Sequence, residues 1–331
     1  MGFIERMKEE ARAKMLKLVL PEGRDSRVIT AAKTLIDENL ISEVFLVGDD
    51  NEIRKNADSI GVKLNDRIII VNPEKSPNRD EYVNEYYELR KHKGMTEAQA
   101  AEEMKGVLSW GAMMVRKDVA YAMVAGAENS TGAVISAALK IIKTAPGIKT
   151  ASSCFIMDKP GSKWGHNGSL IMADCAVIID PTSEQLADIV LAAADSCRSY
   201  LLTEPKIAMM SFSTKGSATH ETVDRVTKAL EIVKAASPDL DVDGELQLDA
   251  SIIPEVGQRK APGSKVAGYA NTLIFPNLNA GNIGYKLTQR FGGFEAYGPV
   301  LQGFAKPVSD LSRGCNANDI VYSSLATINK K

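Results

Sequence analysis

The sequence predicts an α/β protein with a mostly parallel sheet and helices on both of its faces. Short apolar runs alternate with amphipathic runs whose apolar residues recur every three or four positions. Turn residues, such as Pro21–Gly23 and Gly48, separate the two kinds of run. This alternation is typical of strand–helix units in a parallel sheet. The length of 331 residues indicates two domains, since a domain takes about 150 residues.

The first half of the chain contains four predicted strands and five predicted helices. The strands are the apolar runs Lys17–Leu20, Glu43–Val47, Arg67–Val71 and Val119–Gly126. The helices are the amphipathic runs Arg27–Leu40, Asp50–Ile60, Asp80–Lys93, Thr96–Leu108 and Ser130–Thr144.

A second series of elements begins after Pro146-Gly147. Its predicted strands are Ser152–Met157, Cys175–Ile179, Lys206–Phe212 and Leu273–Phe275. Its predicted helices are Thr182–Leu202, Ala218–Ala236, one near Gly281, and Asn316–Thr327. We expect a first domain of residues 1–146 plus 302–331 and a second of residues 147–301, with the end of the chain returning to the first.

Composition excludes several classes of protein. The 42 acidic and 40 basic residues nearly balance, which argues against a nucleic-acid-binding protein. We expect no secretory signal and no membrane span, because the most apolar segment, Val119–Ala127, is too short. The cysteines form no C-x-x-C pair and the three histidines have no metal-ligand spacing, so we expect a cytoplasmic protein without a metal.

Two strand-to-helix turns in the second half are candidate binding sites, because ligands of open α/β sheets bind in such turns. The segment Ser211–Thr219 (SFSTKGSAT) is rich in hydroxyl groups, including those of Ser211 and Ser213, and contains Lys215 and Gly216. It fits either a phosphate site at a helix N-terminus or an ordinary loop with a capping residue. In FPNLNAGNIG (Phe275–Gly284), Asn277 and Asn279 fit a helix cap or a ligand, and Gly281 permits close approach of the backbone.

Two further turns belong to the first domain. The arginines of PEGRDSR (Pro21–Arg27) fit either an anion site or a solvated helix start. Near the end of the chain, Ser312, Arg313 and Gly314 occupy a predicted tight loop. Asn316 is then the N-cap of the last helix, with Asp319 at N3 as in a capping box, so Asp319 is either a cap or a catalytic group. The G-x-S-x-G, G-x-G-x-x-G and Walker A patterns are absent, which argues against a serine hydrolase and a standard dinucleotide fold.

Six segments in order give the chain a recognisable pattern. Together they resemble the phosphate acetyltransferases (phosphotransacetylases) from the start of the chain to its end. They are LPEGRDSR (Leu20–Arg27), YYELRKHKGMT (Tyr86–Thr96), SFSTKGSA (Ser211–Ala218), DGELQLDAS (Asp243–Ser251), NTLIFPNLNAGNIGYKL (Asn271–Leu287) and GPVLQGFAKPVSDLSRG (Gly298–Gly314).

The resemblance implies reversible transfer of an acetyl group between coenzyme A and phosphate. It implies two three-layer α/β domains of the isocitrate/isopropylmalate dehydrogenase kind, with the active site in the cleft between them. It also implies a homodimer formed through the second domain, no tightly bound cofactor or metal, and small-molecule substrates: coenzyme A or acetyl-CoA, acetyl phosphate and phosphate. Neither nucleic acid nor membrane is an expected partner.

The resemblance also assigns roles to residues. The family's catalytic serine falls on Ser312, its neighbouring arginine on Arg313 and its base on Asp319, while a coenzyme-A-linked arginine falls on Arg90. Where the family often has another arginine, this chain has Ser136. Arg27, Lys140 and Lys143 are the candidates to replace that missing cation.

The chemistry needs a thiolate, because a thiol of pKa about 8.5 is only a few per cent ionised at neutral pH. Asp319 is the expected proton acceptor, with orientation of Arg313 or the thiol as its alternative role. Ser312 and loop N–H groups are expected to stabilise the oxyanion, and Arg313 to bind phosphate. We expect direct transfer without an acyl-enzyme on Cys315. Alternatives are a butyryl-type phosphate acyltransferase, an oxidoreductase of similar architecture and a catalytically silent regulatory module.

Overall fold

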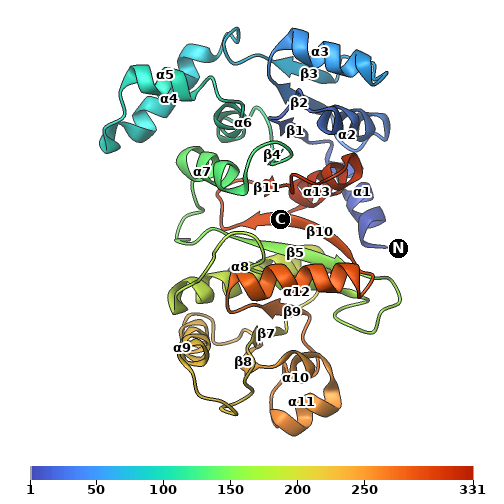
Figure 1. Cartoon of the computed structure of the whole chain (residues 1–331), viewed down its shortest axis with the longest axis vertical. Helices are drawn as coiled ribbons and strands as arrows, with labels where there is room; N and C mark the ends of the chain where they lie inside the picture. Colours follow the sequence, from blue (N-terminus) through green and yellow to red (C-terminus); the bar gives the residue numbers. More distant parts are fainter. Residues whose placement is uncertain (1, 331) are drawn as a thin grey trace. The chain divides into compact units, whose positions relative to one another are not determined.

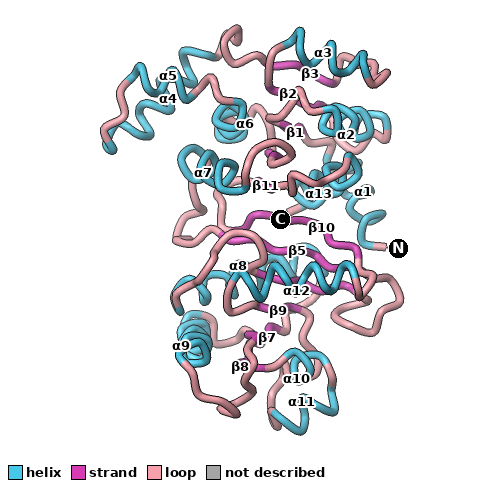
Figure 2. Tube along the Cα trace, viewed as in Figure 1, coloured by secondary structure: helices cyan, strands magenta, loops and turns pink. Residues whose placement is uncertain are grey.

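The computed structural model describes residues 2–330, which form two compact units (Figure 1). Unit 1 contains the chain up to Pro146 together with Phe304–Asn329. Unit 2 contains Gly147–Gly303 and Lys330. Each unit combines a sheet with helices, as Figure 2 shows. The predicted α/β class with a mostly parallel sheet is confirmed.

The sheet of unit 1 consists of five parallel strands in the order β3-β2-β1-β4-β11. The strands are β1 (Lys17–Leu20), β2 (Glu43–Val47), β3 (Ile68–Val71), β4 (Ala122–Ala125) and β11 (Val308–Asp310). Asp310 pairs with Ala125, the last residue of β4, so these two strands end at the same edge. The segments after β1, β4 and β11 therefore meet at the carboxyl edge of this sheet, where parallel sheets bind ligands.

Helices cover both faces of the unit 1 sheet (Figure 1). Helices α2 and α13 pack against one another on one face, and α6 and α7 do so on the other. The helices of this unit are α1 (Phe3–Lys14), α2 (Ser26–Asp37), α3 (Asp50–Ser59), α4 (Arg79–Arg90) with a 3-10 turn at Lys91–Lys93, α5 (Glu97–Glu103), α6 (Val107–Arg116), α7 (Thr131–Ile141) and α13 (Ala317–Asn329).

Helix α6 was not predicted, and the expected helix Thr96–Leu108 is wrong in its second half. The chain ends α5 at Glu103 and begins α6 at Val107, after Gly106. Seven consecutive residues of α6, from Ser109 to Val115, are buried. The run has no charged residue before Arg116, so it lacks the charged face by which a surface helix is recognised, and a short apolar run cannot be assigned to a helix by periodicity alone.

The sheet of unit 2 has six strands in the order β10-β5-β6-β9-β7-β8. Pairs β10–β5 and β5–β6 are antiparallel, and the remaining pairs are parallel. The strands are β5 (Ser152–Asp158), β6 (Ser169–Ala173), β7 (Ile207–Met210), β8 (Val242–Leu246), β9 (Thr272–Ile274) and β10 (Glu295–Gln302). The helices are α8 (Ser183–Leu201), α9 (Glu221–Ala236), α10 (Leu248–Ile252), α11 (Pro254–Lys260) and α12 (Leu278–Arg290).

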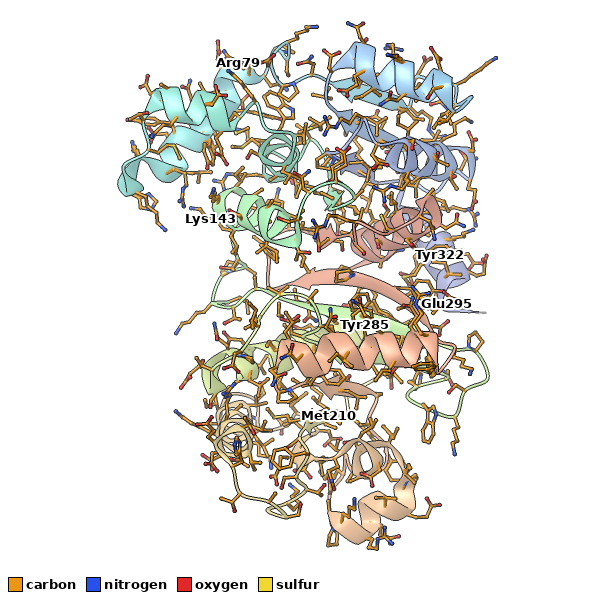
Figure 3. The ribbon with its side chains drawn as sticks, in the orientation of Figure 1. Arg79, Lys143, Met210, Tyr285, Glu295 and Tyr322 are labelled. Carbon is orange, nitrogen blue, oxygen red and sulfur yellow. The ribbon has the colours of Figure 1, made fainter. Side chains whose placement is uncertain are left out.

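The core of unit 2 lies between its sheet and its helices. Tyr285, which Figure 3 labels, belongs to α12. Its ring stacks on that of Phe155 of β5, with ring centroids 4.0 Å apart. Met210, at the end of β7, belongs to the same apolar cluster. Because aromatic side chains bury large areas, this stack fixes α12 on the sheet.

The predicted strand Cys175–Ile179 is wrong, because the strand is β6, which ends at Ala173. The carboxylate of Asp174 accepts hydrogen bonds from the backbone N–H groups of Ala176, Val177 and Ile178, which curls the chain into a turn. Ile179 is 76% exposed. The apolar run Cys175–Ile179 therefore forms a loop and not a strand. Its backbone N–H groups donate to the buried carboxylate of Asp174, where in a strand they would donate to a neighbouring strand.

Candidate active site

The segment Ser312–Asn316, which we call the 312–316 loop, follows β11 at the carboxyl edge of unit 1. Its first three residues are exposed, whereas Cys315 is buried. The N–H of Gly314 donates to Ser312 Oγ at 3.2 Å, and the N–H of Cys315 donates to the Ser312 carbonyl at 2.9 Å. The predicted tight loop is confirmed. It presents a hydroxyl group and a guanidinium group to solvent side by side.

The last helix begins as predicted, with a capping box. Asn316 Oδ1 accepts from the N–H of Asp319 at 3.0 Å, and Asp319 Oδ2 accepts from the N–H of Asn316 at 2.9 Å. Both side chains are exposed. Asp319 therefore acts as a cap, and its carboxylate remains within reach of solvent.

Arg27 joins three segments at this edge of the sheet. Its Nε and Nη2 atoms contact the carboxylate of Asp25, with Nη2 at 2.6 Å from Oδ2. Its Nη1 atom donates to the carbonyl oxygens of Arg313 at 2.8 Å and Cys315 at 3.0 Å. Nη2 also donates to the Ala127 carbonyl at 2.8 Å. Arg27 is thus neither an anion site nor a solvated residue at a helix start. Its guanidinium donates to the backbone of the 312–316 loop and holds it in place.

The partner of Arg27 is a nearly buried carboxylate. The Asp25 side chain is 10% exposed, against 30% for Arg27. Burial raises the pKa of Asp25, but the hydrogen bonds from Arg27 outweigh burial and lower the pKa below its usual range. Asp25 also caps α2 by accepting from the Arg27 N–H at 2.8 Å. The ion pair therefore anchors the first turn of α2 as well as the guanidinium.

Glu22 holds the neighbouring loop, which runs from Gly126 to Asn129 between β4 and α7. Its buried carboxylate accepts four backbone N–H bonds, from residues 126 to 129, and a fifth from Asn129 Nδ2, at 2.7–3.0 Å. Five donors compensate a buried charge that would otherwise be costly. The sequence analysis missed Glu22. The one local signal for this residue is an acidic side chain in the turn that follows an apolar strand.

Arg90 is the last residue of α4. Within residues 2–330, its Nε atom is buried and has no hydrogen-bond partner, and the same holds for the hydroxyl group of Tyr86. Burial raises the pKa of Tyr86; the charge of Glu103 adds to this, and that of Arg90 opposes it. Arg90 and Glu103 therefore both lie close to this hydroxyl group. An unpartnered buried guanidinium nitrogen is what an anionic ligand would satisfy.

A pocket of about 480 Å³ lies next to the 126–129 loop and α7. Its lining includes Glu103, Asn129, Ser136 and Lys140. Lys140 Nζ is 3.7 Å from a carboxylate oxygen of Glu103. Ser136 and Lys140 are one helical turn apart, so they face the same side of α7. Of the three candidates to replace the missing arginine, Lys140 is the one that shares this pocket with Ser136.

The predicted phosphate loop in unit 2 is organised differently from the expectation. Helix α9 begins at Glu221 with His220 as its N-cap, so Lys215 is not at a helix N-terminus. Lys215 Nζ pairs with the carboxylate of Asp243 and donates to the Gly244 carbonyl at 2.9 Å. The predicted helix Ala218–Ala236 starts too early, because the hydroxyl-rich stretch before it folds as a loop.

The other groups of this loop also have internal partners. Ser213 Oγ and the Gly216 N–H donate to Glu245 Oε1 at 2.8 and 2.7 Å. Ser211 Oγ accepts from the Ser213 N–H at 3.1 Å. The binding role of Ser211, Ser213, Lys215 and Gly216 stays a prediction, and their present contacts hold the loop on β8.

The asparagine-rich turn before α12 is a helix start. Asn277 is the N-cap and accepts from the Ala280 N–H at 3.0 Å, while Asn279 is exposed in the first turn. At Gly281, an added Cβ atom would lie 2.1 Å from the Asp174 carbonyl oxygen. Close approach of two backbones therefore explains this glycine.

Within residues 2–330, neither the thiols nor the possible metal ligands indicate a second site. Burial raises the pKa of Cys315 to about 11, so this thiol is a poor nucleophile. Among residues 2–330, we find no group of three or more His, Cys, Asp or Glu side chains that could hold a metal ion. In the same part of the chain, no helix has the length and apolar character to cross a bilayer.

Comparison with known proteins places the chain among the acyltransferases. The family described as Phosphate acetyl/butaryl transferase matches residues 2–328, and the chain belongs to this family. It is 48% identical to the phosphate acetyltransferase of Treponema pallidum (strain Nichols), over 99% of this chain and 98% of that protein. The predicted family is confirmed.

Solved structures agree with this assignment. A phosphotransacetylase from Streptococcus pyogenes superimposes with a TM-score of 0.92 at 42% identity, covering 99% of this chain and 97% of that one. A 4-hydroxythreonine-4-phosphate dehydrogenase from Klebsiella pneumoniae has a TM-score of 0.54 at 10% identity, covering 96% and 100% of the two chains. The latter similarity concerns the fold alone, which is dehydrogenase-like.

Proposed function

We propose that the chain is a phosphate acetyltransferase, which transfers an acetyl group reversibly between coenzyme A and phosphate. The observation that carries the proposal is the exposed Ser312–Arg313 pair, whose backbone Arg27 holds in place. A rigid loop with exposed donors is what a transition state with developing negative charge requires. Membership of the family and the names of the relatives support the same reaction, and favour acetyl over butyryl as the transferred group.

Arg313 is the proposed phosphate-binding group. Its guanidinium is exposed, while its own carbonyl oxygen is the one that accepts from Arg27. The planar guanidinium binds two phosphate oxygens through two parallel N–H donors, a fixed geometry that a lysine ammonium does not offer. The loop therefore fixes the main chain and leaves the side chain to the substrate.

Ser312 is the proposed hydrogen-bond donor to the carbonyl oxygen of the acetyl group. Its Oγ atom already accepts from the Gly314 N–H, so the hydrogen of the hydroxyl group remains available for donation. Loss of one such donor from an oxyanion hole typically costs about 2.7–4 kcal/mol of barrier.

The transfer is proposed to be direct. The thiol of coenzyme A loses its proton, and its sulfur attacks the acetyl carbonyl carbon of acetyl phosphate. The tetrahedral intermediate then breaks its bond to the phosphate oxygen, which leaves acetyl-CoA and phosphate. We assign the thiol proton to Asp319, whose exposed carboxylate lies at the start of α13. Cys315 takes no part, because its thiol is buried and protonated at neutral pH.

Coenzyme A is proposed to bind unit 1 through Arg90 and Lys140. Arg90 has the buried unpartnered Nε atom, and Lys140 lines the pocket beside Ser136. Arg27 is unsuited to this role because its donors already contact Asp25 and three carbonyl oxygens. Lys140 therefore replaces the arginine that the family often has at the position of Ser136. As a substrate, coenzyme A leaves after each turnover, and we propose no resident cofactor or metal.

Assembly and location are also proposals. Apolar side chains at and after α12 are exposed in the isolated chain: Ile283 at 57%, Leu287 at 49% and Phe291 at 87%. Their spacing of four residues places them on one side of the helix, which suits a homodimer through unit 2. Four free cysteines fit a reducing, cytoplasmic compartment.

The test is release of free thiol from acetyl-CoA, measured with and without phosphate or arsenate. We expect release to depend on the anion, and butyryl-CoA to react more slowly than acetyl-CoA. Arg313→Lys is expected to lower kcat/KM for phosphate about a hundredfold, with unchanged thermal unfolding. The reason is that lysine lacks the two parallel N–H donors with which the guanidinium binds two phosphate oxygens. Thiol release that is independent of the anion would refute the proposed reaction. Wild-type kinetics in Arg313→Lys would refute the role of Arg313.

A further inference from the structure

Asp310 has a buried carboxyl group and lies just before the 312–316 loop in the chain. It ends β11, two residues before Ser312, and is 2% exposed. Its Oδ2 atom accepts from the Thr131 hydroxyl group, in the first turn of α7, at 2.5 Å. Its Oδ1 atom is buried and has no hydrogen-bond partner within residues 2–330. Half of this carboxyl group thus lacks the compensation that a buried charge needs.

The same carboxyl group lies against the loop that Glu22 holds. A Cβ atom added to Gly126 would come within 2.5 Å of Asp310 Oδ1, while the N–H of Gly126 donates to Glu22 Oε2 at 2.9 Å. Two buried carboxyl groups therefore flank one glycine. The carboxyl group of Glu22 accepts five hydrogen bonds, whereas that of Asp310 has one oxygen atom without a partner within residues 2–330. Asp310 is therefore the poorly compensated member of the pair, and burial favours its protonated form.

Burial and four neighbouring residues determine the charge state of Asp310. Burial raises the pKa of Asp310 to about 6, which the Thr131 hydroxyl and the Leu311 N–H oppose. In the described part of the chain, the charged groups that act on it are Glu22, which raises the pKa, and Arg313, which lowers it. From α13, the group that reaches β11 is the Thr327 hydroxyl, which contacts Ser309 and does not titrate.

We propose that Asp310 takes up a proton when a doubly charged anion binds at Arg313, and releases it when the anion leaves. The proposal rests on the assignment of phosphate to Arg313. In the free protein, the positive charge of Arg313 favours the ionised form of Asp310. A bound dianion neutralises that charge and adds a negative one, so the neutral carboxyl group becomes favoured.

Linkage gives the sign of the effect on binding. Because anion binding raises the pKa of Asp310, protonation of Asp310 strengthens anion binding by the same factor. Affinity is therefore highest below the pKa of the free protein, and falls as the pH rises from about 6 towards the pKa of the complex. A difference of one unit between these pKa values changes the Kd about tenfold.

The experiment measures binding of sulfate to the full chain by titration calorimetry. Sulfate is the probe because it stays a dianion from about pH 5.5 to about pH 8, unlike phosphate. We expect the Kd of the wild type to increase about tenfold over this range, with proton uptake visible as a dependence of the heat on the buffer. In Asp310→Asn, we expect sulfate to bind with the low-pH affinity at every pH and without proton uptake.

Asp319→Asn is the matched control, because Asp310 and Asp319 are the two carboxylates that flank the 312–316 loop in the chain. If Asp319→Asn abolishes the pH dependence while Asp310→Asn keeps it, the proton is taken up elsewhere and the inference is wrong. Should Asp310→Asn fail to fold, Thr131→Val tests the same point. The hydrogen bond from the Thr131 hydroxyl lowers the pKa of Asp310, so its loss is expected to move the pH at which sulfate affinity falls to a higher value.

Two outcomes separate this inference from the proposed function. Sulfate that binds the wild type with a pH-independent Kd overturns the role of Asp310, while anion-dependent thiol release continues to support the transferase. Sulfate that does not bind at any pH overturns the role of Asp310 together with the assignment of phosphate to Arg313.

Discussion

Replacement of Arg27 by alanine tests whether this residue stabilises the 312–316 loop. The variant loses three hydrogen bonds to the carbonyl oxygens of Ala127, Arg313 and Cys315, and leaves Asp25 without its cation. A hydrogen bond to a charged group contributes about 1.5–3 kcal/mol. Since the Arg27 side chain is 30% exposed and water replaces part of these bonds, we expect a loss of about 2–4 kcal/mol.

The stability measurement is urea denaturation at neutral pH, with Asp25→Asn as the matched variant. Asparagine keeps the capping oxygen of α2 but removes the charge, so we expect a smaller loss, about 1 kcal/mol. The double variant completes a cycle whose coupling energy we expect to exceed about 1 kcal/mol. Because the folded pKa of Asp25 is lowered, its contribution exists above the unfolded value of about 4 and is lost as the pH falls through the folded pKa.

The activity measurement links this ion pair to catalysis. A displaced 312–316 loop misplaces Ser312 and Arg313, and a misplacement of about 1 Å costs about a hundredfold in rate. We therefore expect the kcat of Arg27→Ala to fall by at least about tenfold under conditions where the variant is folded. A variant with wild-type stability and wild-type kcat would refute the proposal that Arg27 holds the loop.

Three further predictions concern other parts of the molecule. Lys140→Ala is expected to raise the KM for coenzyme A about tenfold at unchanged kcat, and addition of Ser136→Arg to restore it; a KM that stays at the wild-type value contradicts the role of Lys140. Gly281→Ala is expected to destabilise unit 2 by about 2 kcal/mol or more in thermal unfolding, because its Cβ atom would overlap the Asp174 carbonyl; unchanged unfolding contradicts that close contact. Cys315→Ala is expected to retain thiol-release activity within about twofold, and complete inactivity with a folded chain would point to an acyl-enzyme.

Some elements were predictable because their signals are local. The run Glu43–Val47 forms β2 with the predicted bounds, since an apolar run that ends at a glycine is visible in five or six residues. The capping box of Asn316 and Asp319 was predictable because both partners are three residues apart. The tight turn at Ser312 belongs to the same category.

Other elements were missed because their environment is not local. Strand β8 contains charged residues that the fold buries, and β11 has three residues, so neither has a clear strand period. The antiparallel strand β10 contains a glycine and a proline, which usually indicate a turn. These strands are defined by the elements that pack against both faces of the sheet, and residues adjacent in sequence do not reveal those elements.

The sequence by itself determined the α/β class, the family and the exposed Ser312–Arg313 pair, because alternation, motif order and turn chemistry are all written in consecutive residues. The tertiary structure decided which side chains serve that pair. Glu22 and Arg27 follow β1, whereas Asp310 ends β11, and these segments lie close together because parallel strands bring distant parts of the chain to one edge of the sheet. The physical reason is that hydrogen bonding and burial, which set the role and pKa of each group, depend on distances in space rather than along the chain.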